Sequence, residues 1–223
     1  MKKNTLIGFA VGLMLLGIAG LSQATSIAAG DYVKLIDYNH LDDAGVLTYA
    51  VSHDQGQTTA FAYKTFCIQE NVYVWLNKWY PVAGLSDTVG LYDDPAPLGA
   101  GKLNGAVDYL FYRYKSGAYD SAMNTDNDEA DLQKLFWSLQ GSGPSYTSIG
   151  TLWASDLDNY NNTAAMHHSW GTKVINIYAV KSGKKVDIQN QLYNPVPEPA
   201  TMLLFGTGLV GLAGLGRRRG KKL

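Results

Sequence analysis

The 223-residue chain has almost balanced charge, with 18 Lys and Arg against 19 Asp and Glu, and it contains one cysteine. The basic residues gather at the two ends, so that residues 25–196 hold 11 Lys and Arg against 18 Asp and Glu, a net charge of −7. This acidic segment argues against nucleic-acid binding, which requires a basic face, and it is long enough for one domain with a hydrophobic core. The sequence implies no cofactor, and its histidines do not have the spacing typical of metal ligands.

Residues 1–24 have the three parts of a secretory signal peptide. Lys2 and Lys3 precede an apolar run from Leu6 to Leu21, and Ser22-Gln23-Ala24 then places small residues at the first and third positions before a cut. The run is short and glycine-rich for a membrane-spanning helix. We therefore expect cleavage after Ala24 and export across the inner membrane. Because exported proteins usually pair their cysteines, the single Cys67 requires an explanation.

The first part of the mature chain, residues 26–79, predicts mainly β-strands. Apolar and polar residues alternate in Asp31–Ile36 and in Thr59–Tyr63. The run from Tyr63 to Trp75 has the β-branched and aromatic bias of a strand and contains Cys67.

Residues 81–101 are rich in glycine, proline and aspartate and predict a loop. Apolar side chains at helical spacing then predict a helix from Asn104 to Tyr114. A second helix should begin at Asp126, where acidic residues complement the helix dipole, and end at Gly141. A weaker pattern predicts a third helix from about Thr151 to Tyr160.

Residues 172–180 return to strand character, and residues 186–188 add a further short strand. The order of strands, helices and strands predicts an α+β domain over residues 25–194, with a β-sandwich or barrel core that carries an inserted helical lobe. The remaining residues, 195–223, form a separate C-terminal segment.

This C-terminal segment contains three features in a fixed order. The motif Pro197-Glu198-Pro199 comes first, an apolar stretch from Ala200 to Gly216 follows, and a basic stop begins with Arg217, Arg218 and Arg219. About 17 apolar residues reach the lower limit for one membrane-spanning helix, whose basic flank should stay cytoplasmic. The segment resembles the PEP-CTERM sorting signal of Gram-negative bacteria. That resemblance implies transient anchoring by the helix and processing by an exosortase-type enzyme, which delivers the protein to the cell surface or extracellular matrix.

The second predicted helix supplies a possible partner for Cys67. Gln133 lies beside the apolar stripe of that helix, with Trp137 one turn further along on the same side. The stretches Phe66-Cys67-Ile68 and Leu132-Gln133…Phe136-Trp137 resemble the two motifs of the bacterial thioester domain found in surface adhesins.

The resemblance implies an internal thioester between Cys67 and Gln133, shielded from water by Phe66 and Trp137. It also implies one-shot covalent attachment to an amine-bearing surface or matrix target, with a role in adhesion or biofilm. Such a protein acts once and does not turn over, so we expect no enzyme activity and no catalytic residues.

Other interpretations of Cys67 stay open from the sequence. A free cysteine in a strand is often a buried, inert residue, and a disulfide-linked dimer is a further alternative. Gln69 lies on the same strand face as Cys67, although residues two apart diverge by about 7 Å. A cysteine protease would need a histidine base, for which His167 and His168 are available, but no local protease signature surrounds Cys67.

An alternative function follows from the aromatic content. Trp75, Trp79, Trp153 and Trp170 include candidates for stacking on sugars. The alternative is therefore a noncovalent exopolysaccharide or biofilm-matrix binding protein in which Cys67 is inert.

Overall fold

Six antiparallel strands form the main sheet, in the order β3-β2-β1-β4-β7-β8. The computed structural model describes residues 26–38, 45–70, 72–92, 98–121, 123, 125–143, 145 and 151–195. The strands of the main sheet are β1 (Tyr32–Tyr38), β2 (Leu47–Ser52), β3 (Phe61–Thr65), β4 (Trp79–Ser86), β7 (Lys173–Lys181) and β8 (Lys184–Tyr193). A second, two-stranded sheet pairs β5 (Thr88–Val89) with β6 (Gly101–Lys102).

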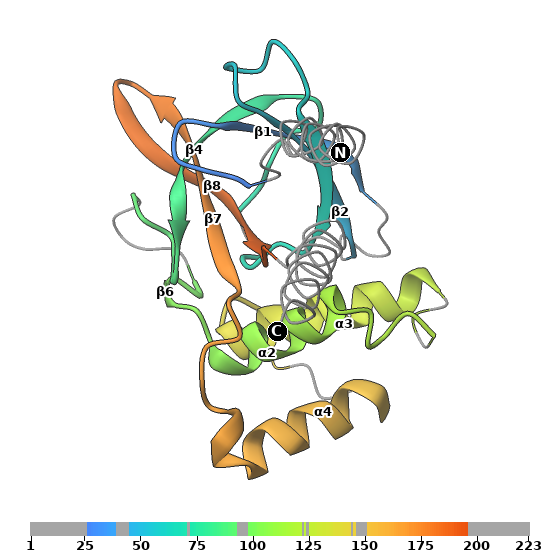
Figure 1. Cartoon of the computed structure of the whole chain (residues 1–223). Coiled ribbons are helices and arrows are strands. Elements are labelled where there is room, and N and C mark those ends of the chain that lie inside the picture. The colour runs from blue at the N-terminus through green and yellow to red at the C-terminus, as the bar shows by residue number, and fades with distance from the viewer. Residues whose placement is uncertain are drawn as a thin grey trace, which may run out of the picture.

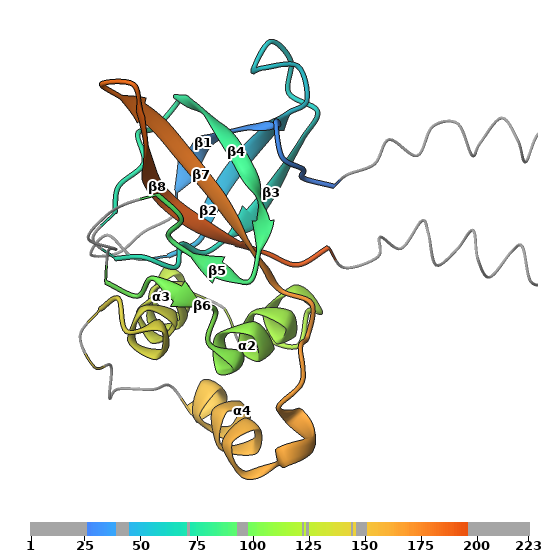
Figure 2. The same ribbon diagram turned by 90° about the vertical axis from the view of Figure 1, so that its left-hand side faces the viewer.

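The sheet curls until its two edges meet, so that it forms a barrel (Figures 1 and 2). The backbone N–H of Ile68, just beyond β3, donates to the carbonyl of Asn190 in β8 at 3.0 Å. The backbone N–H of Leu192 donates to the carbonyl of Phe66 at 3.1 Å. These two bonds join β8, at one edge of the sheet, to the residues that follow β3, at the other edge.

Three α-helices form the inserted lobe, and their predicted ends are close to those observed. They are α2 (Gly105–Lys115), α3 (Asp126–Gln140) and α4 (Thr151–Asn162), followed by the short 3₁₀ helix η1 (Ala164–Met166). The Asn104 side chain caps α2, and Thr125 forms a capping box with Asp128 at the start of α3. Gly141 ends α3 in the left-handed conformation, with φ of 75°, which glycine adopts at little cost.

The helices cover one open end of the barrel. Helices α2 and α3 lie across that end, and α4 packs on α2 further from the barrel (Figure 2). One hydrophobic cluster fills the barrel, and a second fills the space between the barrel and the helices. Phe66 belongs to the second cluster, where its ring meets Phe136 edge-on at 5.2 Å between centroids. The architecture is therefore α+β, as predicted, with the helical lobe inserted between β6 and β7.

The predicted loop over residues 81–101 is wrong at its start, at β5 and at Gly101, all of which belong to strands. Pro81 to Ser86 belong to β4, which lies between β1 and β7 in the sheet. The register shifts between Val82 and Gly84, so the glycine marks a β-bulge and not a turn. The strand at 63–75 is also shorter than predicted, because β3 ends at Thr65.

No helix among the described residues is long and apolar enough to cross a membrane. The predicted signal peptide at residues 1–24 and the predicted sorting helix after Pro199 lie outside the described residues.

Candidate functional site

Cys67 lies where the barrel closes, on the short stretch of chain that follows β3. It faces Gln191 of β8 in an isolated antiparallel bridge. The hydrogen bonds to β8 come from its neighbours Phe66 and Ile68, so the N–H and C=O of Cys67 itself point away from β8. On that other side β2 begins only at Leu47, which pairs with Thr65. Cys67 therefore presents one backbone donor and one backbone acceptor that no strand satisfies.

The side-chain amide of Gln133 fills this gap. The backbone N–H of Cys67 donates to Oε1 of Gln133 at 3.0 Å, and Nε2 of Gln133 donates to the Cys67 carbonyl at 2.6 Å. Gln133 is 0% exposed. Buried backbone groups require partners, so the amide takes the place of a peptide group in a neighbouring strand. Helix α3 is thereby attached to the barrel at Cys67.

The sulfur of Cys67 lies against the same amide. Its thiol donates to Oε1 of Gln133, with 3.4 Å between Sγ and the oxygen. Burial raises the pKa of Cys67 to about 12, with a further rise from the negative charge of Glu70, while the Trp137 indole opposes part of the rise. The thiol is therefore protonated at neutral pH, and its reactivity must come from its position and not from ionisation.

The two predicted shielding residues lie in different places. Trp137 is 6% exposed and packs with Cys67 and Ala130 in a small cluster of its own. Phe66 points instead into the core between barrel and helices, next to Phe111 and Phe136. Trp137 covers the sulfur directly, whereas Phe66 holds the backbone of the Cys67 segment against the helices.

The side chains that were alternative partners for Cys67 form hydrogen bonds with other groups. Gln69 is buried, but its Oε1 accepts from the backbone N–H of Asn190 at 3.2 Å. His167 bonds the Tyr160 carbonyl, and His168 bonds the Ala165 carbonyl. Neither histidine has a contact with Cys67 among the described residues, and within these residues no group of three or more metal-ligating side chains occurs.

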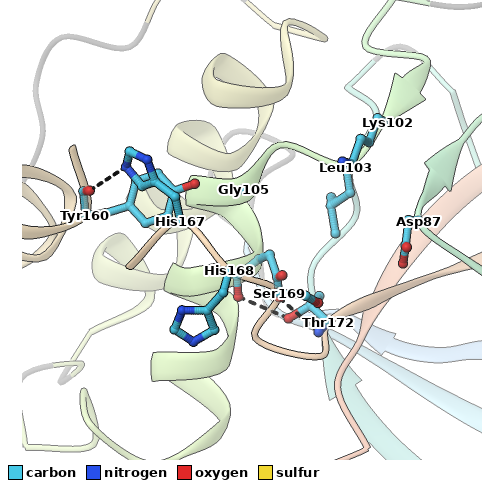
Figure 3. A pocket seen from close by; sticks show the side chains of 10 residues that line it. Asp87, Lys102, Leu103, Gly105, Tyr160, His167, His168, Ser169 and Thr172 are labelled. Atoms are coloured by element: carbon cyan, nitrogen blue, oxygen red, sulfur yellow. Dashed lines mark hydrogen bonds between the residues drawn. The ribbon is translucent and has the colours of Figure 1, made fainter. Parts of the chain in front are cut away.

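Both histidines line a polar cavity of about 380 Å³ beside the start of α2 (Figure 3). Asp87, Lys102, Asp108 and Thr172 contribute to its walls, and the buried carboxylate of Asp108 already accepts bonds from the backbone N–H groups of Trp170 and Thr172. The cavity does not include Cys67 or Gln133 in its lining.

Residues 195–219 match the family model of the PEP-CTERM protein-sorting motif. The chain ends in an exosortase sorting signal. The protein is therefore exported and passes through membrane-linked sorting, as the Pro197-Glu198-Pro199 motif predicted. No curated protein and no solved structure matches the chain. The match lies outside the barrel and the helices, so their function must be argued from the site itself.

The turn that follows α3 and lies against the Cys67 segment was not predicted from the sequence. The hydroxyl of Ser142 donates to the Ile68 carbonyl at 3.0 Å, which holds the turn on the Cys67 segment. A Cβ atom on Gly143 would lie 2.8 Å from Oε2 of Glu70 and 3.0 Å from Cβ of Trp137. A side chain at this position would have to displace the Glu70 carboxylate and press on Trp137. The pattern Gly-Ser-Gly directly after a helix was the only available signal.

Proposed function

We propose that this exported PEP-CTERM protein forms an internal thioester between Cys67 and Gln133 and uses it for one-shot covalent attachment to an amine-bearing target at the cell surface or in the extracellular matrix. The observation that carries the proposal is the contact of 3.4 Å between Sγ of Cys67 and Oε1 of a fully buried Gln133. A buried glutamine on a helix needs a specific reason, and here its amide is held against a thiol.

Formation of the bond follows from the contacts of the amide. The sulfur attacks Cδ of Gln133, the C–S bond forms, and the C–N bond breaks. The thiol proton passes to the departing nitrogen, which leaves as ammonia. Negative charge develops on Oε1 during the attack, and the Cys67 backbone N–H already donates to that atom. The Cys67 carbonyl accepts from Nε2 and so holds the leaving group in place.

The proximity of the thiol and the amide further lowers the barrier to thioester formation. The thiol is held beside the amide by the closure of the barrel, and fixed reacting groups can replace several kcal/mol of the barrier, up to about 7–11 in the best cases. Burial of both side chains also keeps water from hydrolysing the product. The thioester then serves as a stored electrophile: an incoming amine forms an amide with Gln133 and releases the Cys67 thiol. Each molecule reacts once, so the protein is not an enzyme.

The intact mass of the purified exported protein tests the proposal. We expect wild-type protein to lack the mass of one ammonia, and we expect methylamine to add its full mass. The Cys67→Ala and Gln133→Ala variants pass through the same processing and should show their full sequence masses with no methylamine adduct. A wild-type protein of full mass, with Cys67 unreactive to thiol reagents until denaturation, would make the cysteine an inert core residue.

A second candidate function is noncovalent binding of matrix polysaccharide, which one surface feature favours. Tyr73 is 73% exposed and Trp75 is 71% exposed, and they stand two residues apart on the loop before β4. Of the other predicted sugar-stacking residues, Trp153 is buried and Trp79 lies under Lys34 at 4.7 Å. The pair at 73 and 75 is clearly more exposed than Tyr38, which follows at 41% among the described aromatic residues.

Under this second function, Trp75→Ala should weaken retention on purified matrix polysaccharide about tenfold, because one lost aromatic stack costs roughly 0.5–1.5 kcal/mol beyond its buried area. Affinity electrophoresis measures the effect. Leu98→Ala is the matched control, since Leu98 is also exposed but lies on another loop. Cys67→Ala should retain full binding if this function is correct. Equal retention of wild type and Trp75→Ala would exclude Trp75 from polysaccharide binding.

A further inference from the structure

A carboxylate lies at the edge of the proposed thioester. Glu70 follows Cys67 by three residues. The position that a Cβ on Gly143 would occupy is 2.8 Å from Oε2 of Glu70 and 3.0 Å from Cβ of Trp137, so these two side chains lie close together. Trp137 in turn packs on Cys67. The charge of Glu70 also acts on the sulfur, because it contributes to the raised pKa of Cys67. Glu70 and Cys67 therefore both lie beside Trp137.

The Glu70 carboxylate is also free to act. Glu70 is half-buried, and it has no hydrogen bond or ion pair with any of the residues that the structure describes. By contrast, Asp31, Asp54, Asp108 and Asp156 all accept bonds from neighbouring groups. An unpaired carboxylate close to a thiol makes thiol ionisation harder, so it does not help the formation of the thioester. Its position suits the second step, in which a nucleophile enters.

We propose that Glu70 binds the incoming primary ammonium group and takes its proton, so that Glu70 sets the rate at which the site reacts with charged primary amines. This inference rests on the proposed thioester. The ammonium transfers one proton to Glu70, and the resulting amine attacks Cδ of Gln133. The C–N bond forms and the C–S bond breaks, while the second amine proton goes to the Cys67 sulfur. The products are an amide on Gln133, a Cys67 thiol and a protonated Glu70, which returns its proton to solvent.

Burial of the reacting atoms limits the shape of the nucleophile. Cys67 is 3% exposed and Gln133 is 0% exposed. Trp137 packs on Cys67, and the turn at Ser142 bonds the nearby Ile68 carbonyl. A lysine carries its amine on a slim four-carbon stem and can reach past these groups. A primary amine on a slim stem therefore suits the site.

The experiment compares nucleophiles on the exported protein and its Glu70→Gln variant, by intact mass over time. Both proteins should first show the mass deficit of one ammonia. We expect Glu70→Gln to react with Nα-acetyl-lysine at least tenfold more slowly than wild type, since a positioned proton acceptor contributes typically 10²–10⁴-fold. Hydroxylamine, which is uncharged at neutral pH, should lose much less. Asp158→Asn, which removes an exposed acid on α4, serves as the control for net charge.

The outcomes separate this inference from the thioester itself. A Glu70→Gln protein that keeps the mass deficit and reacts with acetyl-lysine at the wild-type rate would overturn the role of Glu70 and leave the thioester standing. Wild-type protein of full mass would overturn both. If Glu70→Gln does not form the thioester, the wild-type protein provides the test. Its rate of reaction with acetyl-lysine, relative to its rate with hydroxylamine, should fall as salt is added. Equal salt responses would overturn the inference.

Discussion

Removal of the Gln133 amide is expected to destabilise the protein by about 2–5 kcal/mol, even where no thioester can form. The amide satisfies both the N–H and the C=O of Cys67, and loss of a partner costs a buried polar group about 1–3 kcal/mol. The Cys67→Ala variant keeps these backbone groups but has no sulfur. Comparison of Cys67→Ala with Cys67→Ala/Gln133→Ala by urea unfolding therefore isolates the two hydrogen bonds from the proposed covalent bond.

Lys134→Ala in the same Cys67→Ala background is the matched control. Lys134 is the next residue on α3 and is only half-buried, so its loss should change the free energy of unfolding by no more than about 0.5 kcal/mol. A cost below about 1 kcal/mol for the Gln133 change would mean that water or a shifted chain replaces the amide. The attachment of α3 to the barrel at Cys67 would then be weaker than the contacts indicate.

Phe136→Ala is the second change with a large expected effect, a loss of about 3–5 kcal/mol in the free energy of unfolding. Phe136 is completely buried between barrel and helices, and its ring contacts Phe66 at 5.2 Å and Phe111 at 6.3 Å between centroids. Alanine would leave a cavity at this junction and remove edge-on aromatic contacts that strengthen it further. Denaturant unfolding measures the loss.

The same variant should also loosen the site. Phe66 packs on Phe136 and precedes Cys67, so a cavity there frees the segment that holds the thiol against Gln133. We expect the fraction of Phe136→Ala protein with the ammonia mass deficit to fall below that of wild type. Phe136→Leu, which fills most of the volume, should recover most of both losses. A normal mass deficit in a strongly destabilised Phe136→Ala would show that the packing of Phe66 on Phe136 is not needed to hold the Cys67 thiol against Gln133.

The sequence by itself determined the features that depend on local chemistry. The caps at Asn104, Thr125 and Gly141 satisfy the backbone groups at helix ends, and the helices are found at the predicted places. The sorting signal at the C-terminus is likewise a linear motif, read from residues close together in the chain. The strand and helix periods were enough to place the α+β class, because amphipathic spacing reports which face of each element is buried.

Only the tertiary structure decided what lies next to Cys67. Leu192 bonds the backbone of Phe66 from more than a hundred residues away, and no local pattern encodes that closure. The sequence predicted Gln133 at the edge of the apolar stripe of its helix, whereas it is completely buried, because a strand segment with unsatisfied backbone groups packs there. Pro81 and Gly84 read as a loop, yet pairing on both sides makes β4 an interior strand. In each case long-range pairing of backbone groups outweighed the local preference of the residues.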